Sequence, residues 1–430
     1  MKAVAIVGAG WAGLAAAVAA ARQGHEVTLY EASRSLGGRA RSLEVALPEG
    51  ASIVLDNGQH ILAGAYVETL RMMETVGVAP AEVLHRMPLT MRFPDGGGIA
   101  FAACKAPWDA LAGIVAAKGW TWLDRWSLLR AAVAWRLAGF RCDPAMSVAQ
   151  LCRGLTPRAM RELIEPLCVS ALNTPAELAS AEVFLRVMRD ALFREGHRGG
   201  AGSNLLVPTR DLGQVFPDAA LSWLQRHGAD LRLGHRVHAL ARERAHWEVD
   251  GERFEQVLLA CAPWDAARLV ASSGVAAEAW LSHVGALRYE AIATVYARGG
   301  PALPLPLMAL RDGPAQFVFD RARFGAPAGT LAFVVSASEG DRESLQSAVV
   351  RQAAALGWDV QPLQTVVEKR ATFACVPGMK RPGMSIAPGL LACGDYVAGP
   401  YPATIEGAVR SALAAADEFG RGPRPRESAT

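Results

Sequence analysis

The chain begins with a long hydrophobic run. A cluster of glycines divides it into a strand-like part and a helix-like part. Residues 3–7 are a short apolar run, which predicts a buried parallel strand. Residues 14–23 are rich in helix-forming alanine, and Gly24 after them is a typical helix C-cap. Residues 25–30 return to a strand pattern. The order of strand, helix and strand predicts a parallel βαβ unit at the start of an α/β fold.

The same uncharged run, residues 3–21, also has the length of a signal peptide or a membrane span. Three glycines at fixed offsets interrupt it, and a second strand pattern follows directly. These two features favour a buried strand followed by a helix over a targeting segment.

The three glycines form a Gly-x-Gly-x-x-Gly motif between the first strand and the helix. Gly8 allows the tight turn, Gly10 lets the backbone approach a pyrophosphate, and Gly13 permits close packing of helix on strand. The predicted helix begins around Trp11 and Ala12. Its N-terminus supplies N–H groups for phosphate oxygens. In this setting the motif predicts a dinucleotide site.

An acidic residue and a second glycine pair follow the second strand. Glu31, with Ala32 beside it, is placed to bind ribose hydroxyls. Gly37, Gly38 and Arg39 suit a loop that wraps anionic oxygens. The alternative for this loop is an ordinary glycine turn on the surface.

The last hydrophobic run, residues 389–395, predicts a strand that ends in Gly394 and Asp395. An acid at a strand end, followed by a helix N-terminus, can hold ribityl hydroxyls and the pyrimidine edge of a flavin. The alternative is a plain final βα unit. The helix opens at Ala403, Thr404 and Ile405. The tail at residues 421–428 has the composition of a disordered segment.

Composition narrows the class of protein. The 430 residues are 51% hydrophobic and 20% charged, with a net charge of +3, which gives no electrostatic footprint for nucleic acid. The seven cysteines are scattered and never form a C-x-x-C pair, so we expect no disulfide framework, no metal site and a cytoplasmic location. A nucleophile elbow and a second glycine-rich nucleotide motif are also missing from the sequence, so no motif indicates the electron donor.

A tryptophan-rich stretch at residues 106–140 is predicted to be helical. An aromatic face with a basic rim suits a helix lying in a membrane interface, which would place the protein peripherally on the inner face of the cell membrane. The alternative is a core helix pair in which tryptophan supplies packing bulk. The tryptophans are Trp108, Trp120, Trp122, Trp126 and Trp135, and the basic residues are Lys118, Arg125, Arg130, Arg136 and Arg141.

The motifs at the two ends of the chain together resemble the flavin amine oxidase and phytoene desaturase superfamily. The resemblance implies FAD as the cofactor, with its pyrophosphate at the N-terminal glycines and its adenosine ribose at Glu31. It further implies that the Gly-Gly-Arg loop lies near pyrophosphate and flavin, and that Asp395 binds the ribityl chain. The backbone of Val237, in a strand-like segment, is implied to touch the adenine.

The same resemblance implies the domain organisation. We expect a Rossmann-like FAD-binding domain of the GR2 type, made of residues 1–65, 200–265 and 385–425. The two inserts, residues 66–199 and 266–384, are expected to form an α+β substrate domain. Within the middle segment, Asp250-Gly251 between apolar runs predicts a two-residue hairpin.

Within that superfamily, three stretches are similar to the hydroxysqualene dehydroxylases, squalene-associated FAD enzymes of bacterial hopanoid synthesis. They are DNGQHILAGAY at residues 56–66, residues 167–175 and residues 394–406. The resemblance implies that hydroxysqualene and reduced FAD give squalene, oxidised FAD and water. The alternatives are an FAD-dependent isoprenoid desaturase, an amine oxidase and an FAD-bearing lipid-binding protein. The amine oxidase is the weaker one, because only Tyr396 and Tyr401 offer an aromatic cage near Asp395.

The stretch DNGQH contains the candidate catalytic residues. Asn57-Gly58 is typical of a hairpin corner, but its place after the Gly-Gly-Arg loop favours donors aimed at flavin or substrate. His60 is the best candidate for the acid that protonates a leaving hydroxyl, because a histidine pKa lies near neutral. Asp56 could orient His60, and Gln59 is a further donor. The alternative for His60 is a hydrogen bond without proton transfer.

One further stretch is open to two readings. Residues 166–175 mix apolar residues with Cys168, Ser170 and Asn173. They could line an apolar pocket with a few polar contacts, or they could simply end a helix before Pro175.

Overall fold

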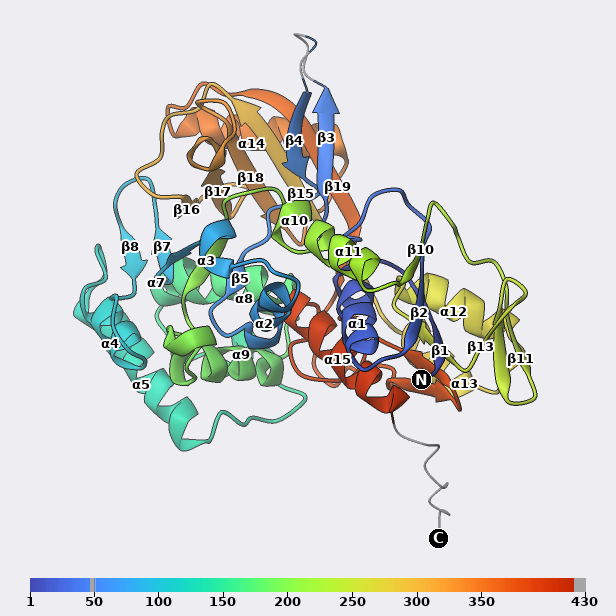
Figure 1. The fold of residues 1–430 in the computed structure, drawn as a ribbon. Helices are drawn as coiled ribbons and strands as arrows, with labels where there is room; N and C mark the ends of the chain where they lie inside the picture. Colours follow the sequence, from blue (N-terminus) through green and yellow to red (C-terminus); the bar gives the residue numbers. More distant parts are fainter. Residues whose placement is uncertain (47–49, 51, 421–430) are drawn as a thin grey trace.

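The computed structural model describes residues 1–46, 50 and 52–420. The predicted disordered tail lies outside the described residues. A six-stranded sheet, in the order β10, β2, β1, β14, β21 and β20, forms the lower right of the molecule (Figure 1). Five strands are parallel, and β20 pairs antiparallel at one edge. The bounds are β10 Asp230–Leu233, β2 Glu26–Glu31, β1 Ala3–Val7, β14 Gln256–Leu259, β21 Leu390–Ala392 and β20 Ser385–Ala387.

Helix α1 (Trp11–Arg22) connects β1 to β2, which confirms the βαβ unit. Side chains of β1 alternate between the two faces of the sheet, as a strand's period of two requires. Val4 and Ile6 pack into the cluster formed with α1, α11 (Pro217–Arg226) and α15 (Ile405–Phe419). Val7 packs on the opposite side, where Trp247 also lies. Both faces of this sheet are therefore covered.

The opposite face is covered by a three-stranded sheet and by α12 (Pro263–Ser272) and α13 (Glu278–Gly285). Its strands are β11 Leu240–Glu243, β12 His246–Val249 and β13 Glu252–Phe254. The predicted hairpin is confirmed, with Asp250 and Gly251 at φ of 48° and 87° between β12 and β13. The apolar run after it divides, because Phe254 ends the hairpin whereas Gln256 begins β14 in the large sheet.

A second, five-stranded antiparallel sheet forms the upper part of the molecule (Figure 1). Helix α14 (Arg342–Ala355) packs on one of its faces, through the cluster that contains Val295 and Phe333. Tyr296, on the other face, belongs to the cluster shared with the six-stranded sheet. The strands are, in order, β16 Leu307–Ala309, β17 Phe317–Asp320, β18 Leu331–Ser336, β15 Tyr289–Arg298 and β19 Gln361–Phe373. A hairpin of β3 (Ser42–Ala46) and β4 (Ser52–Asp56), which we did not predict, rises beside it.

The segment between β4 and β10 is largely helical, as expected, and also contains short strands. Besides α11, its helices are α2 Val67–Thr75, α3 Pro80–Val83, α4 Trp108–Val115, α5 Trp122–Leu137, α6 Val148–Leu151, α7 Pro157–Ala159, α8 Glu165–Leu172, α9 Ala181–Phe193 and α10 Leu212–Val215, with a π turn at Met160–Ile164 and a 3-10 turn at His197–Gly199. Its strands are β5 Leu62–Ala63, β9 Leu205–Pro208 and β6 Leu84–Met87 in one sheet, and β7 Thr90–Arg92 and β8 Gly98–Ala100 in another. The expected class, an α/β fold with an inserted α+β region, is confirmed. The domain boundaries stay a prediction, supported by the separate segments that supply the six-stranded sheet.

Close packing at Gly13 gives a first testable prediction. An alanine Cβ at this position would lie 1.8 Å from Gly8 O, inside the turn between β1 and α1. We expect Gly13→Ala to lower the free energy of unfolding by about 1–3 kcal/mol, because the helix must shift to admit the methyl group. Urea denaturation measures it. Gly285→Ala at the end of α13 is the matched control, because its methyl group meets nothing within 4 Å. Equal losses in the two variants would contradict the packing argument.

Candidate active site

A cavity of about 630 Å³ lies at the carboxyl ends of the parallel strands. Residues of β15, β19 and the end of α8 close it from the other side. All but Gly13 of the residues expected to hold the dinucleotide line it. These are Gly8, Gly10, Trp11, Ala12, Glu31, Ala32, Gly37, Gly38, Arg39, Asn57, Gly58, Val237, Gly394, Asp395, Ala403, Thr404 and Ile405. The structure therefore brings the two ends of the sequence together at one cavity.

Glycine backbone forms one wall of the cavity. A Cβ at Gly38 would lie 3.3 Å from Gly10 Cα, so the two glycine loops meet without side chains. The Gly37 N–H donates to Ala9 O at 3.0 Å and fixes the second loop against the first. Helix α1 begins beside them with Gly10 as its N-cap, and no described side chain caps it. Its first N–H groups are thus available to an anionic ligand.

Glu31 and Val237 lie at another part of the lining. The Glu31 carboxylate accepts hydrogen bonds from Ala9 N at 2.7 Å and Ser33 N at 2.8 Å. A carboxylate has about four acceptor sites, so it keeps capacity for ribose hydroxyls. Val237 is buried, but the expectation that it lies in a strand is wrong, because residues 235–239 form an irregular connection between β10 and β11.

Arg39 forms an ion pair with Asp395, with 2.5 Å between Nη2 and Oδ1. Its Nη1 donates to Ala371 O at 2.8 Å, which ties the Gly-Gly-Arg loop to β19. Arg39 thus connects the first glycine region, the end of β21 and the second sheet. The contact positions the Asp395 carboxylate at the cavity.

The loop before α15 carries backbone strain. Tyr401 and Ala403 both have φ of 58°, a left-handed conformation that side chains disfavour. A Cβ at Gly407 would lie 2.0 Å from Tyr401 O, so this glycine allows the helix to pack on the strained loop. The Thr404 hydroxyl caps α15 by accepting from Gly407 N at 3.0 Å.

Tyr396 supplies an unused donor at the cavity. Its side chain is buried, and its hydroxyl has no hydrogen-bond partner among the described residues. Burial raises the pKa of this phenol well above its ordinary value, so it stays protonated. A buried donor without a partner is costly unless a ligand accepts its hydrogen bond. Together with the glycine wall and the free helix end, this donor fits a bound dinucleotide such as FAD.

The stretch Asp56–His60 leaves β4 as a bend that runs along the cavity, and the hairpin-corner interpretation is wrong. The Asn57 amide donates to Glu368 Oε2 at 3.2 Å and to Arg39 O at 3.3 Å. His60 Nδ1 lies 2.9 Å from Gly58 O. Burial lowers the pKa of His60, and Arg39 lowers it further, against the opposing effect of the Gly58 contact. A neutral imidazole that donates from Nδ1 to Gly58 O leaves Nε2 as an acceptor.

Gln59 is held by residues far away in the sequence. Its Nε2 donates to the Tyr296 hydroxyl at 2.8 Å, and its Oε1 accepts from Arg321 Nη1 at 3.4 Å. The Tyr296 hydroxyl in turn donates to Asp56 O at 2.8 Å. No local motif marks Tyr296 or Arg321, so the sequence prediction missed both.

Asp56 does not orient His60, contrary to expectation. Its carboxylate accepts from Leu212 N at 2.8 Å and lies 3.8 Å from Arg321 Nη2. Burial raises the pKa of Asp56 to about 6, although Arg321 and the Leu212 hydrogen bond act in the opposite direction. Asp56 thus supports the wall that holds Gln59.

Residues 166–175 both end helix α8 and line part of the cavity. The helix ends at Leu172, and Asn173 follows with φ of 45°. Ser170, Ala171, Leu172 and Asn173 also line the cavity. Asn173 donates to Thr372 Oγ1 at 2.9 Å and accepts from Ala337 N at 2.7 Å, which fixes the helix end against the second sheet.

Comparison with known proteins agrees with this geometry. Residues 11–419 match the family of flavin containing amine oxidoreductases. The chain belongs to this family. It is therefore an FAD-dependent oxidoreductase, and FAD is its cofactor. The expectation of an FAD enzyme is confirmed.

Three similar proteins extend the comparison. The hydroxysqualene dehydroxylase of Sinorhizobium fredii is 28% identical over 97% of this chain and 98% of its own length. The protein of the same name from Rhodopseudomonas palustris is 29% identical over 97% and 98%. The crystal structure of an oxidoreductase from Methanosarcina mazei has a TM-score of 0.72 at 16% identity, over 96% of this chain and 99% of that one. This last likeness concerns the fold alone.

The Asp56 pKa predicts how stability depends on pH. The pKa in the folded state, about 6, lies above the ordinary value of 3.8. Between these values the folded chain keeps a proton that the unfolded chain has lost, so this group's contribution to stability is lost as pH rises. Asp56→Asn does not titrate. Relative to this variant, we expect the wild type to lose about 3 kcal/mol of unfolding free energy as pH rises from 3.8 to about 6, with no further change at higher pH.

Urea denaturation at a series of pH values and saturating FAD measures this difference. Asp359→Asn, at an exposed position, controls for the loss of one carboxylate. A difference between wild type and Asp56→Asn that stays constant or increases with pH would contradict the raised pKa.

Proposed function

We propose that this enzyme catalyses the reductive dehydroxylation of hydroxysqualene to squalene, as a step of hopanoid and isoprenoid synthesis. The observation that carries the proposal is the similarity to proteins named hydroxysqualene dehydroxylase over 97% of the chain. Ile61, Leu172 and Ile292 contribute apolar surface to the cavity, which suits the hydrocarbon chain of an isoprenoid alcohol.

The reaction balances with one hydride, one proton and one hydroxyl group. The hydroxyl leaves as water after it receives a proton, and the carbon that it leaves takes a hydride. When bound in its reduced form, FAD supplies that hydride. The chain has to orient the alcohol, exclude water from the reacting carbon and provide the proton.

His60 is the proposed donor of the proton to the leaving hydroxyl. Its ring lines the cavity, and its Nδ1 contact with Gly58 O directs Nε2 to the other side of the imidazole. Because burial lowers its pKa, the protonated ring is scarce near neutral pH but gives up its proton readily. Gln59 and Asp56 are assigned a supporting role, since their contacts hold the wall beside His60.

The proposal includes a location. The enzyme is proposed to be cytoplasmic and attached peripherally to the inner face of the cell membrane, because a C30 hydrocarbon leaves water for lipid. None of the described helices is long and apolar enough to cross a membrane.

Product analysis tests the reaction. The protein is reduced under anaerobic conditions, given hydroxysqualene and extracted. We expect one squalene for each flavin oxidised, and no squalene from oxidised protein. If no squalene forms, and squalene or phytoene instead bleaches the flavin of oxidised protein, the enzyme is a desaturase.

His60→Gln tests the proton donor. Rapid mixing of the reduced variant with hydroxysqualene should show flavin reoxidation slowed by about 100- to 10,000-fold, the usual contribution of a general acid. His85→Gln is the matched control, because His85 is an exposed residue of β6. Reoxidation of the His60 variant at the wild-type rate would leave the residue a structural role only.

A further inference from the structure

Exposed apolar side chains gather on two adjacent helices. In Figure 1, α4 and α5 form the left edge of the molecule, far from the six-stranded sheet. We call the α4–α5 surface the exposed residues Trp108, Leu111 and Val115 of α4 with Trp122, Leu123, Trp126, Val133 and Leu137 of α5. Trp122 is 76% exposed and Leu137 is 84% exposed. The other large exposed apolar residues of the described chain, Met1, Val54, Leu178, Leu233 and Leu356, come from separate parts of the sequence.

Two of the five tryptophans of this stretch have a different role. Trp120 and Trp135 are buried, at 4% and 7% exposure, and serve as the packing bulk that the core-helix reading expected. Trp108, Trp122 and Trp126 point outward with exposures of 64%, 76% and 64%. The structure thus separates a packed side of the helices from an outer apolar side.

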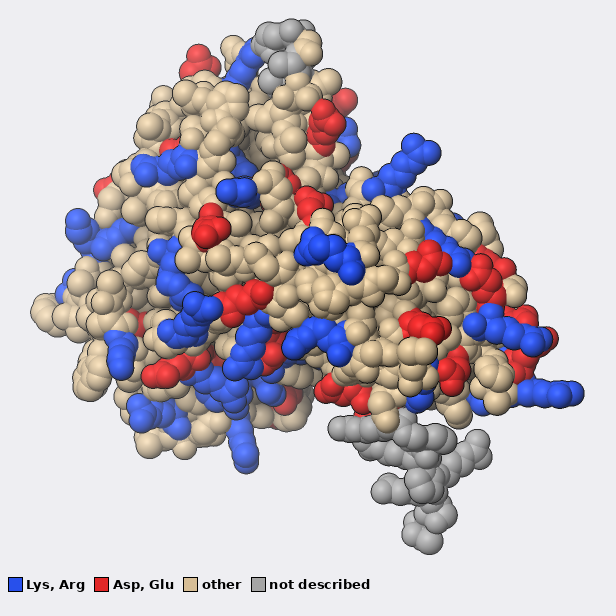
Figure 2. All heavy atoms as spheres, in the orientation of Figure 1, with Lys and Arg blue, Asp and Glu red and all other residues tan. Residues whose placement is uncertain are grey.

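The exposed charges within residues 100–141, which contain the α4–α5 surface, are of one sign. The acidic residues between positions 100 and 141 are Asp109 and Asp124, and both are buried. Asp109 accepts from Ser203 Oγ at 2.6 Å, inside the protein. The exposed charged residues of this stretch are Lys105, Lys118, Arg130, Arg136 and Arg141. Figure 2 shows basic side chains among uncharged residues along this edge.

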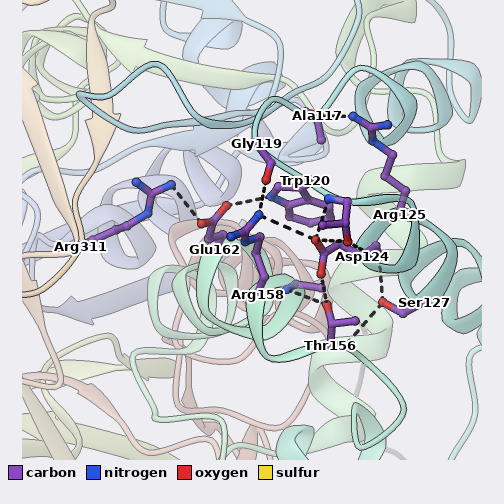
Figure 3. A network of polar contacts seen from close by, with 12 residues as sticks. Ala117, Gly119, Trp120, Asp124, Arg125, Ser127, Thr156, Arg158, Glu162 and Arg311 are labelled. Carbon is purple, nitrogen blue, oxygen red and sulfur yellow. Dashed lines mark hydrogen bonds and ion pairs between the residues drawn. The ribbon is translucent and has the colours of Figure 1, made fainter.

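A polar network fixes α5 with its apolar side outward (Figure 3). Asp124 accepts from Thr156 Oγ1 at 2.7 Å and from Thr121 Oγ1 at 2.7 Å, which also caps the start of α5. Trp120 Nε1 donates to Glu162 Oε2 at 2.8 Å, and Arg311 of the second sheet's connection donates to Glu162 Oε1 at 3.0 Å. These hydrogen bonds hold the inner side of α5 against the rest of the protein. The outer residues of α5 therefore do not belong to the protein core.

We propose that the α4–α5 surface docks on an anionic phospholipid bilayer. Tryptophan rings suit the boundary between headgroups and acyl chains, and a rim of lysine and arginine suits lipid phosphates. The apolar side lies flat, since α5 has only 16 residues and a helix rises about 1.5 Å per residue. The exposed basic residues of this stretch argue against a symmetric contact with a second copy, which would place like charges together. This inference does not depend on which isoprenoid reacts.

Vesicle flotation of the full-length, FAD-loaded protein tests the docking surface. Vesicles of phosphatidylcholine alone are compared with vesicles that also contain phosphatidylglycerol. We expect the protein to float with the anionic vesicles, and the bound fraction to fall as salt is raised. Brominated lipids should quench tryptophan fluorescence, because Trp122 and Trp126 enter the interface.

Two sets of substitutions separate the apolar and the basic contributions. Trp122→Ser with Trp126→Ser and Leu137→Ser should lower the partition constant at least about tenfold at every salt concentration. Lys118→Gln with Arg130→Gln and Arg141→Gln should lower it mainly at low salt. Leu178→Ser with Leu356→Ser is the matched control, which removes exposed apolar residues from other parts of the surface. FAD absorbance and the unfolding midpoint confirm that each variant is folded.

Three outcomes would overturn the proposal. They are failure of the wild type to float with anionic vesicles, flotation of the apolar variant at the wild-type level, and equal loss in the control variant. If the wild type instead forms dimers that the apolar variant does not form, the surface is an interface between copies of the chain. Because flotation needs no turnover, its result is independent of product analysis.

Discussion

Contact of backbone with backbone at glycine is the constraint on which the cavity depends. The chain after β1 lies so close to the end of β14 that a Cβ at Gly8 would lie 2.9 Å from Ala260 C, and helix α1 lies so close to the same turn that a Cβ at Gly13 would overlap Gly8 O. Gly407 does the same at the other end of the chain, against Tyr401 O. These contacts bring two helix N-termini to the carboxyl edge of one sheet, where N–H groups are free for an anionic cofactor.

The second sheet depends on that arrangement for its position and completes the cavity. Arg39 joins the Gly-Gly-Arg loop to β19 through Ala371 O, and Asn57 reaches Glu368 on the same strand. On the adjacent strand β15, Tyr296 bonds both to the backbone of Asp56 and to the Gln59 amide. One wall of the cavity therefore consists of glycine backbone, and the other is fixed by side-chain hydrogen bonds between distant segments.

The features that depend on local sequence rules could be predicted from the sequence. The βαβ unit, the Asp250-Gly251 hairpin and the N-terminal glycine loop of the cavity follow from glycine geometry and strand–helix periodicity, whereas Val237 and the stretch at Asn57-Gly58 were assigned to the cofactor site by the family resemblance. The partners of Gln59 could not be predicted, because Tyr296 and Arg321 approach it only through the packing of the second sheet. The role of Asp56 was missed for the same reason. Its carboxylate is bonded to the N-terminus of α10, at Leu212, which is 156 residues further along the chain.

In the tryptophan-rich segment, packing and not composition determines which tryptophans are buried. Both readings of residues 106–140 were open from the sequence. The core-helix reading describes the buried Trp120 and Trp135, whereas the membrane reading of the exposed side stays a proposal. Trp120 is a core residue whose indole N–H bonds to Glu162, whereas Trp122, two positions later, is exposed. The capping box at Thr121 and Asp124 fixes this change of direction, because it sets the rotation at which α5 begins. A helix turned by two positions would place Trp122 where the buried Asp124 lies and Asp124 where the exposed Trp126 lies, so the burial of one carboxylate determines which aromatic residues face outward.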